Sequence, residues 1–324
     1  MKNQIKPKII AKLLFVFIFL LSVKSFSQTK PIRTHDPSTT FFENGKYYNF
    51  CTGNGIQVMS SPDLKDWKLE NSIFEKDNFP KWILEFVPNF KGHFWAPDLV
   101  FMNGYYYLYY SCSTFGAATS AIGVVRNRSL DSTNANFKWE DLGLFIKSSK
   151  REDFNAIDPG LNREADGKVY LTYGSFHAGI GLCEVDTVSG KPKTEIKKIA
   201  GGSGSDWEAP YIIKNGDEFF LFANNGSCCK GINSTYYIVV GKSKNIFGPY
   251  LDKEGRDLSA GGGTIVKRSE GNTLGPGHVG IVNGGPKGLI STHFYDGADK
   301  GAMKITFWNL KFKKGWPVFS ACKQ

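Results

Sequence analysis

Three acidic residues along this chain each lie beside a proline, or one residue from it, just before an aromatic hairpin. They are Asp36 in His35-Asp36-Pro37, Asp158 in Ile157-Asp158-Pro159 and Glu208 in Glu208-Ala209-Pro210. Acids at matching places in a repeated unit can converge on one point in space. Two converging carboxyl groups, one acting as an acid and one as a base or nucleophile, are what cleavage of a glycosidic bond requires. The sequence therefore predicts a glycoside-cleaving site built from these acids.

The neighbours of each acid suggest different protonation states. Glu208 follows Trp207 and enters an apolar strand, so desolvation is expected to raise its pKa. A carboxylic acid that stays protonated near neutral pH can donate its proton to a leaving oxygen. A second carboxylate nearby, Asp158, would raise the pKa of Glu208 further. Asp36 lies in an Asp-Pro pair, which is also a common turn dipeptide. Singly, each acid is more often structural; together, at matching places, they favour catalysis.

The elements that must position these acids are expected to be β-hairpins. Aromatic and β-branched runs alternate with turn signals, and long amphipathic helices are absent, which indicates an all-β fold. The turn dipeptides tolerate the positive φ angles of a two-residue hairpin turn. They are Asn44-Gly45, Asn103-Gly104, Asp166-Gly167 and Asn215-Gly216, with a weaker fifth version in Gly285-Pro286-Lys287-Gly288.

Upstream of the five turns lie five related segments at a period of roughly 50 to 70 residues, which is typical of a four-stranded propeller blade. The segments are His35-Asp36-Pro37-Ser38, Ala96-Pro97-Asp98-Leu99, Ile157-Asp158-Pro159-Gly160, Glu208-Ala209-Pro210-Tyr211 and Gly277-His278-Val279-Gly280. We expect a five-bladed β-propeller with four-stranded antiparallel blades around a central channel, into which the innermost strands direct their polar residues. A β-sandwich would explain the turns but not the upstream acids and histidine.

Residues 1–27 have the pattern of a secretory signal peptide, with scattered lysines, an apolar run from Leu13 to Leu21 and small residues around Ser27. The alternative is an uncleaved N-terminal anchor, although the apolar run is short for a membrane span. We expect residues 28–324 to form a single catalytic domain that is secreted to the periplasm or the cell exterior and acts as a monomer.

The charge of the chain does not indicate a nucleic-acid binder. The formal charge is +10, and loss of the five lysines of the leader, which contains no acid, leaves about +5. The remaining lysines and arginines are scattered and form no basic stripe. A mild positive charge could favour acidic cell-wall polymers, but solubility is the simpler interpretation. No segment after the leader is apolar enough to place the mature chain in a membrane.

Six cysteines are present, none with the C-x-x-C spacing of a zinc site. Cys51 and Cys112 fall in expected strands, where free thiols pack as small hydrophobic groups. The adjacent residues Cys228 and Cys229 are not expected to bridge to each other. The prediction is therefore mostly buried thiols and no zinc.

From Thr34 to about His278 the chain resembles the arabinanases of glycoside hydrolase family 43. The matching stretches are Thr34-His35-Asp36-Pro37-Ser38, Ser61-Pro62-Asp63-Leu64 with Trp67, Phe94-Trp95-Ala96-Pro97-Asp98, Tyr109 to Gly116, Asn155-Ala156-Ile157-Asp158-Pro159, Gly174-Ser175-Phe176, Glu208-Ala209-Pro210-Tyr211, Cys228-Cys229 to Asn233-Ser234-Thr235-Tyr236, and Gly275-Pro276-Gly277-His278. The resemblance implies a five-bladed propeller that cuts α-1,5-linked arabinan, a side chain of pectin, with endo action. The Cys-Cys stretch favours arabinanases over the xylosidases of the family.

The resemblance also implies roles for the acids. Asp36 would be the general base that activates water, Glu208 the general acid, and Asp158 the residue that tunes the pKa of Glu208 and holds it in place. The expected result is inversion at the anomeric carbon, which requires Asp36 and Glu208 to lie roughly 6.5–9.5 Å apart. A spacing near 5 Å would indicate a retaining enzyme instead.

Substrate contacts and a cation site are implied by the same resemblance. The substrate-binding set is Asp36, Phe94, Trp95, Gly116, Asn155, Ala156, Ile157, Asp158, Gly174, Ser175 and Phe176. Phe94 and Trp95 would stack on sugar rings, although core packing is an equal alternative for Phe94. His278 would lie near the channel axis beside a cation, often calcium, linked through water because calcium prefers oxygen ligands. No organic cofactor is expected.

The sequence also allows functions other than endo cleavage of arabinan. His177 stands where similar enzymes usually carry Trp, which removes apolar area for sugar stacking and predicts a weaker or displaced subsite. The rivals are an exo-acting arabinanase, an arabinofuranosidase or a β-xylosidase of the same family, and a non-catalytic sugar-binding propeller. A retaining enzyme like the fructan-cleaving propellers is disfavoured by Ser38, where those enzymes carry Asn.

Overall fold

The computed structural model describes residues 32–75, 77–202 and 206–322, and from Ile32 on the chain forms one unit. The predicted leader lies outside the described residues. Within them the fold is all-β: strands dominate, and the helices are the short α1 (Ile83–Phe86) and the 3-10 turns η1 (Gly231–Asn233), η2 (Leu258–Ala260) and η3 (Gly297–Asp299). None of the helices in this part of the chain is long and apolar enough to cross a membrane.

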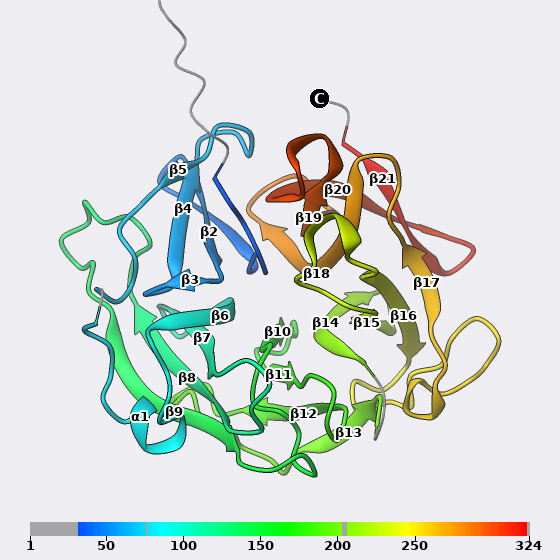
Figure 1. The fold of residues 1–324 in the computed structure, drawn as a ribbon, viewed down its shortest axis with the longest axis horizontal. Helices are drawn as coiled ribbons and strands as arrows, with labels where there is room; N and C mark the ends of the chain where they lie inside the picture. Colours follow the sequence, from blue (N-terminus) through cyan, green and yellow to red (C-terminus); the bar gives the residue numbers. More distant parts are fainter. Residues whose placement is uncertain (1–31, 76, 203–205, 323–324) are drawn as a thin grey trace, which may run out of the picture. The chain divides into compact units, whose positions relative to one another are not determined.

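The strands form successive four-stranded antiparallel groups in chain order, as Figure 1 shows. The first group is β1 (Thr40–Glu43), β2 (Lys46–Cys51), β4 (Gln57–Ser61) and β5 (Lys68–Leu69). The second is β6 (His93–Met102), β7 (Tyr105–Ser113), β8 (Ser120–Asn127) and β9 (Glu140–Ser148), with the short β3 (Gly53–Asn54) at its edge.

The later groups follow the same plan. The third is β10 (Gly160–Arg163), β11 (Val169–Tyr173), β12 (Ile180–Val185) and β13 (Lys197–Ala200). The fourth is β14 (Glu208–Asn215), β15 (Glu218–Asn225), β16 (Tyr237–Ser243) and β17 (Thr264–Lys267). The last is β18 (Thr273–Asn283), β19 (Leu289–Asp296), β20 (Ala302–Lys313) and β21 (Trp316–Ala321). A parallel pairing of β1 with β18 joins the two ends of the chain.

The predicted hairpins are confirmed, because each turn dipeptide joins the first two strands of a group. Asn44-Gly45 connects β1 to β2 with φ angles of 47° and 80°, and Asn103-Gly104 connects β6 to β7 with 51° and 75°. Two successive positive φ angles define the hairpin turn for which Asn-Gly is favoured. The third hairpin has a longer connection, which runs from residue 164 to residue 168.

The first strands of the groups contact one another in turn: β18 contacts β1 and β14, β14 contacts β10, and β10 contacts β6. They are drawn nearest the middle of Figure 1. The buried carboxylate of Asp98 holds three of these segments together, since Oδ1 accepts the Thr39 N–H and Oδ2 accepts the Leu161 N–H, both at 2.7 Å. The Thr39 and Tyr211 hydroxyls, 2.7 Å apart, add the fourth group. Asp98 is therefore structural in its contacts.

A cavity of about 620 Å³ lies between the first strands, on the side of the hairpin turns. Its lining includes Leu99, Leu161, Tyr211 and Ile281 but none of the candidate catalytic acids. This cavity is therefore separate from the site that the sequence predicts.

Backbone φ angles at or just before the first strand of each group show which residues occupy equivalent positions in the five groups. Five residues there have left-handed φ angles between 42° and 58°. They are Asp36, Ala96, Asp158, Ala209 and His278. The prediction of acids at matching places is therefore correct for Asp36 and Asp158 and wrong for Glu208 and Asp98, which stand one residue before and two residues after the equivalent position. Register irregularities of β6, β14 and β18 at these entries re-aim the side chains.

The cysteines differ in part from the prediction. Cys51, Cys112 and Cys183 are buried free thiols, as expected. Cys228 and Cys229, which were expected not to bridge, form a disulfide between adjacent residues. Their Cα atoms lie 3.8 Å apart, which is shorter than most disulfides span. A left-handed backbone at Cys229, with φ of 63°, accompanies this pairing.

Candidate active site

Asp36 lies just before β1 in a cluster of polar side chains that leaves its own side chain 14% exposed. Its Oδ2 accepts the Thr52 hydroxyl at 2.6 Å and lies 2.7 Å from His35 Nδ1. Its Oδ1 lies 3.4 Å from His278 Nδ1. Burial by itself raises the pKa of Asp36, but the facing His35 and His278 rings outweigh it and hold the pKa well below its ordinary value. Asp36 is therefore ionised at neutral pH.

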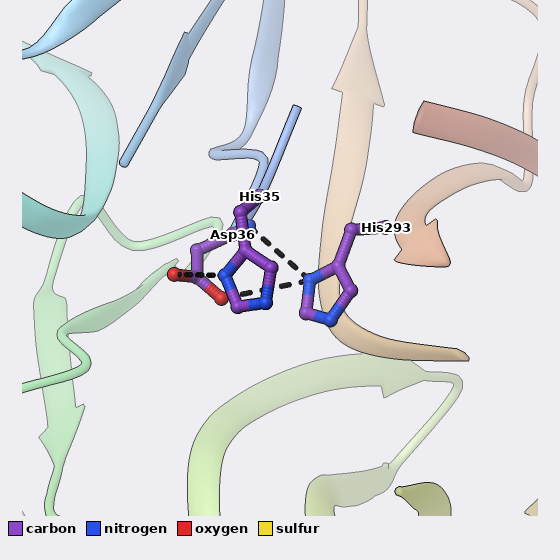
Figure 2. A group of neighbouring side chains, drawn as sticks. All are labelled: His35, Asp36 and His293. Atoms are coloured by element: carbon purple, nitrogen blue, oxygen red, sulfur yellow. Dashed lines mark hydrogen bonds and ion pairs between the residues drawn. The ribbon is translucent and has the colours of Figure 1, made fainter. Parts of the chain in front are cut away.

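A third histidine, His293 on β19, completes this polar cluster, and Figure 2 shows it beside His35 and Asp36. The Asp36 N–H donates to His293 Nδ1 at 3.2 Å, so the imidazole proton of His293 lies on Nε2. That Nε2 is buried and has no hydrogen-bond partner in the described part of the chain. Burial lowers the pKa of His293 well below its ordinary value, which keeps the ring neutral. His35 stacks on it with ring centroids 3.9 Å apart.

Asp158 and Glu208 form a second, coupled acidic pair. Asp158 Oδ2 accepts the Ala209 N–H at 3.1 Å, so this carboxyl group holds the backbone next to Glu208. Glu208 Oε2 accepts the Ser175 hydroxyl at 2.8 Å, and the Tyr236 hydroxyl also bonds to the Glu208 side chain. The two acids retain only 9% and 8% of their surface exposed.

The electrostatics of this pair oppose those of Asp36. Burial raises the pKa of both acids; the charge of Glu208 adds to the effect on Asp158, and the charge of Asp36 adds to the effect on Glu208. The hydrogen bond from Ser175 lowers the pKa of Glu208 but does not reverse the shift. Such a pair titrates as a unit and retains a proton to higher pH than an isolated carboxyl group. The site thus holds an ionised carboxylate, Asp36, and a coupled pair of carboxyl groups, Asp158 and Glu208, that retains a proton.

His278 connects the two halves of the site. Its backbone N–H donates to Asn224 Oδ1 at 2.9 Å, which fixes the bulged segment of β18. Burial lowers the pKa of His278, but Asp36 and Asp158 outweigh it and the net shift is upward. The charge of His278 in turn affects Asp36, Asp158 and Glu208. The structure therefore brings all four predicted residues together.

The donor atoms around Asp36 are a poor fit to direct calcium coordination. Ligating atoms of His35, Asp36 and His293 lie within 4.8 Å of one another. Both nitrogens of His35 and Nδ1 of His293 already take part in the hydrogen-bond network. Calcium also prefers oxygen ligands. His278 Nδ1 faces Asp36 Oδ1 at 3.4 Å, and its water-mediated link to a cation stays a prediction.

Antiparallel pairing determines which loops lie near the acids. The hairpin turns lie at one end of the first strands, and the acids lie at the other end. The loops between the second and third strands of each group return to the end with the acids. They are residues 52–56, which include β3, and residues 114–119, 174–179, 226–236 and 297–301.

Several predicted substrate-binding residues are accessible there. Gly116 is exposed, Trp95 is half-buried and Phe176 is 43% exposed. The Gly174 N–H donates to the Ile157 carbonyl at 2.9 Å, which holds two of the predicted segments together. These positions remain candidates for sugar contacts.

Other predicted contacts are buried. Phe94 is fully buried and packs against the rings of Phe74, Phe90 and Tyr110, so its predicted sugar stacking is wrong and the core-packing alternative is correct. Ala156 is also fully buried, because it packs in the cluster between the second and third groups, so its side chain cannot contact a sugar.

Asn155 is nearly buried, and its Oδ1 accepts the Ser120 hydroxyl at 2.8 Å. This bond fixes the start of the segment that leads to Asp158.

Sequence reasoning missed four residues that contact the acids, Thr52, Ser111, Tyr236 and His293, and also Tyr295, which contacts His35. Tyr236 ends the Asn233-Ser234-Thr235-Tyr236 stretch, so its motif was visible without its role. His293 and Tyr295 alternate along β19, the strand that pairs with β18. That spacing of polar rings on the strand paired with the segment around His278 was the available signal.

Comparison with known proteins gives consistent matches. The model for "Glycosyl hydrolases family 43" matches residues 29–317. An extracellular endo-alpha-(1->5)-L-arabinanase of Bacillus subtilis (strain 168) is 39% identical, over 88% of this chain and 87% of its own length. An extracellular exo-alpha-(1->5)-L-arabinofuranosidase of Cellvibrio japonicus (strain Ueda107) is 36% identical, over 89% and 86%. A Cellvibrio cellulosa alpha-L-arabinanase solved with arabinohexaose has a TM-score of 0.84 at 37% identity, over 90% and 96%.

Proposed function

The chain belongs to glycosyl hydrolase family 43, and from this premise we propose that it cleaves α-1,5-L-arabinofuranosidic bonds within arabinan by one inverting displacement. The main support for this mechanism is that the pKa values of the acids in this one site shift in opposite directions. The pKa of Asp36 is lowered, whereas the pKa values of Asp158 and Glu208 are raised. An ionised base and a protonated acid are the two groups that inversion requires.

In this mechanism Asp36 accepts a proton from a water molecule as the water oxygen attacks the anomeric carbon. Glu208 donates its proton to the glycosidic oxygen as the bond to the leaving sugar breaks. Asp158 positions Glu208 through the Ala209 N–H and keeps the pair protonated. After one turnover Asp36 holds a proton and Glu208 has lost one, so exchange with solvent restores the site.

The fold that supports this mechanism is proposed to be a five-bladed β-propeller. The support is that five four-stranded antiparallel groups follow one another in the chain and that their first strands contact each other in turn. The pairing of β1 with β18 would close the ring. The acids would then lie at one mouth of the central channel, where an extended polysaccharide can reach them.

The proposed substrate places the protein outside the cytoplasm. The relatives from B. subtilis and C. japonicus are named extracellular, and residues 1–27 have the pattern of a secretory leader. We propose that the mature chain is secreted and works as a monomer on arabinan side chains of pectin.

An exo-acting enzyme is the second candidate. A relative named as exo-acting is nearly as similar as the endo-acting one. His177, which stands where an indole would add a stacking surface, is only half-buried. The acids would be the same in both cases, so the difference would lie in how far the sugar chain extends past them.

Product analysis on debranched arabinan tests the proposed function. An endo enzyme produces a ladder of oligosaccharides early in the reaction, so we expect this ladder by chromatography. One small product of fixed length from the start would favour exo action. Release from xylan with none from arabinan would contradict the proposed substrate.

A cation beside His278 is a further part of the proposal, and its removal is expected to lower activity. Prolonged dialysis against a chelator should reduce kcat or the melting temperature, and added Ca²⁺ should restore it, because a bound ion stabilises the folded state by mass action. A matched sample with His278→Gln should respond less to the chelator. Equal kcat and melting temperature before and after dialysis would argue against a functional cation.

A further inference from the structure

A buried hydrogen-bond chain connects the Cys228–Cys229 disulfide to the carboxylate of Asp36. The Cys229 N–H donates to the Tyr295 hydroxyl oxygen at 2.7 Å. The same oxygen lies 2.8 Å from His35 Nε2, and His35 Nδ1 lies 2.7 Å from Asp36 Oδ2. Tyr295 and His35 retain only 1% and 9% exposure, so water competes little for these bonds. The chain joins segments 260 residues apart in the sequence.

The direction of each bond follows from groups that have only one role. A backbone N–H can only donate, so the Tyr295 oxygen accepts from Cys229. The carboxylate of Asp36 can only accept, so a neutral His35 carries its proton on Nδ1, and Nε2 accepts the proton of the Tyr295 hydroxyl. Burial raises the pKa of Tyr295, so the phenol keeps this proton. A neutral imidazole that accepts at Nε2 carries its proton on Nδ1, from which it donates to Asp36. Asp36 therefore sets the tautomer of His35, and the Tyr295 hydroxyl holds the opposite nitrogen of the ring.

The same network leaves one oxygen of Asp36 for chemistry. Thr52 Oγ1 accepts the Ala96 N–H at 2.8 Å, so its proton goes to Asp36 Oδ2. Oδ2 thus receives two donors, from Thr52 and His35, and its position is fixed. Oδ1 has only the longer contacts with histidine nitrogens, at 3.4 and 3.5 Å. Oδ1 is therefore the oxygen with capacity to accept a proton from water.

The disulfide holds the donor at the start of this chain. Cys228 and Cys229 lie in the loop between β15 and β16, and the adjoining η1 contacts β19, which carries Tyr295. The left-handed backbone of Cys229 directs its N–H to Tyr295. Cys229 is exposed, so a soluble dithiol can reach the bridge. The other four cysteines are free thiols, so this is the bond that a reductant would break.

We propose that the Cys228–Cys229 disulfide and Tyr295 are positioning elements for the base, acting through His35 to fix the orientation of Asp36. The inference rests on the proposed role of Asp36 as the base. Neither Tyr295 nor the disulfide would touch the substrate's reacting atoms in this scheme. Both act by holding the His35 ring so that its Nδ1–H points at Asp36.

Replacing Tyr295 by Phe tests the hydroxyl alone. Tyr295→Phe should lower kcat about 10- to 100-fold, the range found when a metal-binding histidine loses its outer hydrogen-bond partner, and should leave KM nearly unchanged. Tyr250→Phe is the matched control, because Tyr250 is equally buried and donates one hydrogen bond, to the Ile246 carbonyl, away from the acids. Equal effects of the two substitutions on kcat would overturn the role of Tyr295.

Reduction tests whether the disulfide works through Tyr295. A dithiol should lower kcat of the wild type, and Cys228→Ser/Cys229→Ser should show the same loss without responding to the dithiol. Because coupled residues are not additive, the dithiol should have little further effect on Tyr295→Phe. A full additional loss in Tyr295→Phe would show that the disulfide acts by another route and would overturn the connection.

A measurement without substrate separates this inference from the proposed function. Nitrogen-15 NMR of the labelled imidazoles reports the tautomer of each of the five histidines. The wild type should show His35 protonated on Nδ1, and both Tyr295→Phe and reduction should move the His35 Nε2 resonance, because the hydrogen bond to Nε2 is lost or displaced. A His35 Nε2 resonance that does not move on reduction would refute the relay even if arabinan is cleaved. A moved resonance in a protein that does not cleave arabinan would refute only the proposed function.

Discussion

Glu208→Gln is expected to lower kcat on arabinan by about 10²- to 10⁴-fold, which is the usual contribution of a positioned acid. In free energy this is about 3–5 kcal/mol of barrier. Gln matches Glu in shape and can still accept the Ser175 hydroxyl bond, so KM should change little. It has no proton to transfer to the leaving oxygen. Steady-state kinetics on debranched arabinan measures both parameters.

The leaving group distinguishes loss of the acid from loss of structure. An aryl arabinofuranoside with a strongly acidic phenol needs no proton on departure, so Glu208→Gln should cleave it at close to the wild-type rate. Glu218→Gln is the control, since it removes only the surface ion pair with Lys242. If Glu208→Gln cleaves arabinan at the wild-type rate, or loses both substrates equally, Glu208 is not the acid.

The pH dependence of activity is an independent test of Glu208 as the acid. The acid works while protonated, and the pKa values of Glu208 and Asp158 are raised, mainly by burial. Activity should therefore persist through neutral pH and fall as pH rises through the raised pKa of the pair. The fall at low pH should begin well below the ordinary carboxyl range, because the pKa of Asp36 is lowered. The residual activity of Glu208→Gln should lack the fall at high pH.

Local sequence signals predicted the parts of this fold that depend on few residues. Asn44-Gly45 and Asn103-Gly104 specify their turns because the required φ angles are a property of the dipeptide itself. The acids Asp36, Asp158 and Glu208 were visible because each has a distinctive neighbour. These features could be predicted because they do not depend on which strands become neighbours in the fold.

Features that depend on distant pairing could not be predicted in the same way. The sequence is equally consistent with Phe94 stacking on a sugar ring and with Phe94 packing in the core. Only the rings of Phe74 and Tyr110 packed around it show that it belongs to the core. The equivalence of Asp158 with Ala209, not with Glu208, depends on backbone φ angles that the residue types do not disclose. The contact of His35 with Tyr295 spans 260 residues and follows from the register of β19.

The adjacent cysteines show a different limit. Bridging of neighbours requires an uncommon backbone conformation, so general disulfide geometry argued against it. The structure accommodates it at Cys229, where a left-handed backbone also supplies the N–H that Tyr295 accepts. The left-handed backbone of Cys229 thus also makes the contact with Tyr295, which the sequence alone does not predict.

Asp36→Asn is expected to be the second severe variant, with kcat on arabinan lowered by about 10²- to 10⁴-fold. An amide cannot accept a proton from the attacking water. If its NH₂ replaced Oδ2, it would face the hydroxyl of Thr52 and Nδ1–H of His35, so the amide oxygen must take that place and the NH₂ must take the place of Oδ1. The position proposed for proton acceptance would then hold a donor. The variant should still bind arabinan oligosaccharides, which isothermal calorimetry can verify.

The stereochemistry of the first product shows whether this residue activates water or attacks the sugar directly. Proton NMR of early product, before mutarotation, should show the β-anomer from the α-linked substrate, because one displacement inverts the anomeric carbon. Asp66→Asn, a change at an exposed acid outside the site, should leave both rate and anomer as in the wild type. An α-anomer would mean two displacements and a covalent intermediate. Asp36 would then be a nucleophile, and the proposed separation from Glu208 of about 6.5–9.5 Å for an intervening water would be wrong.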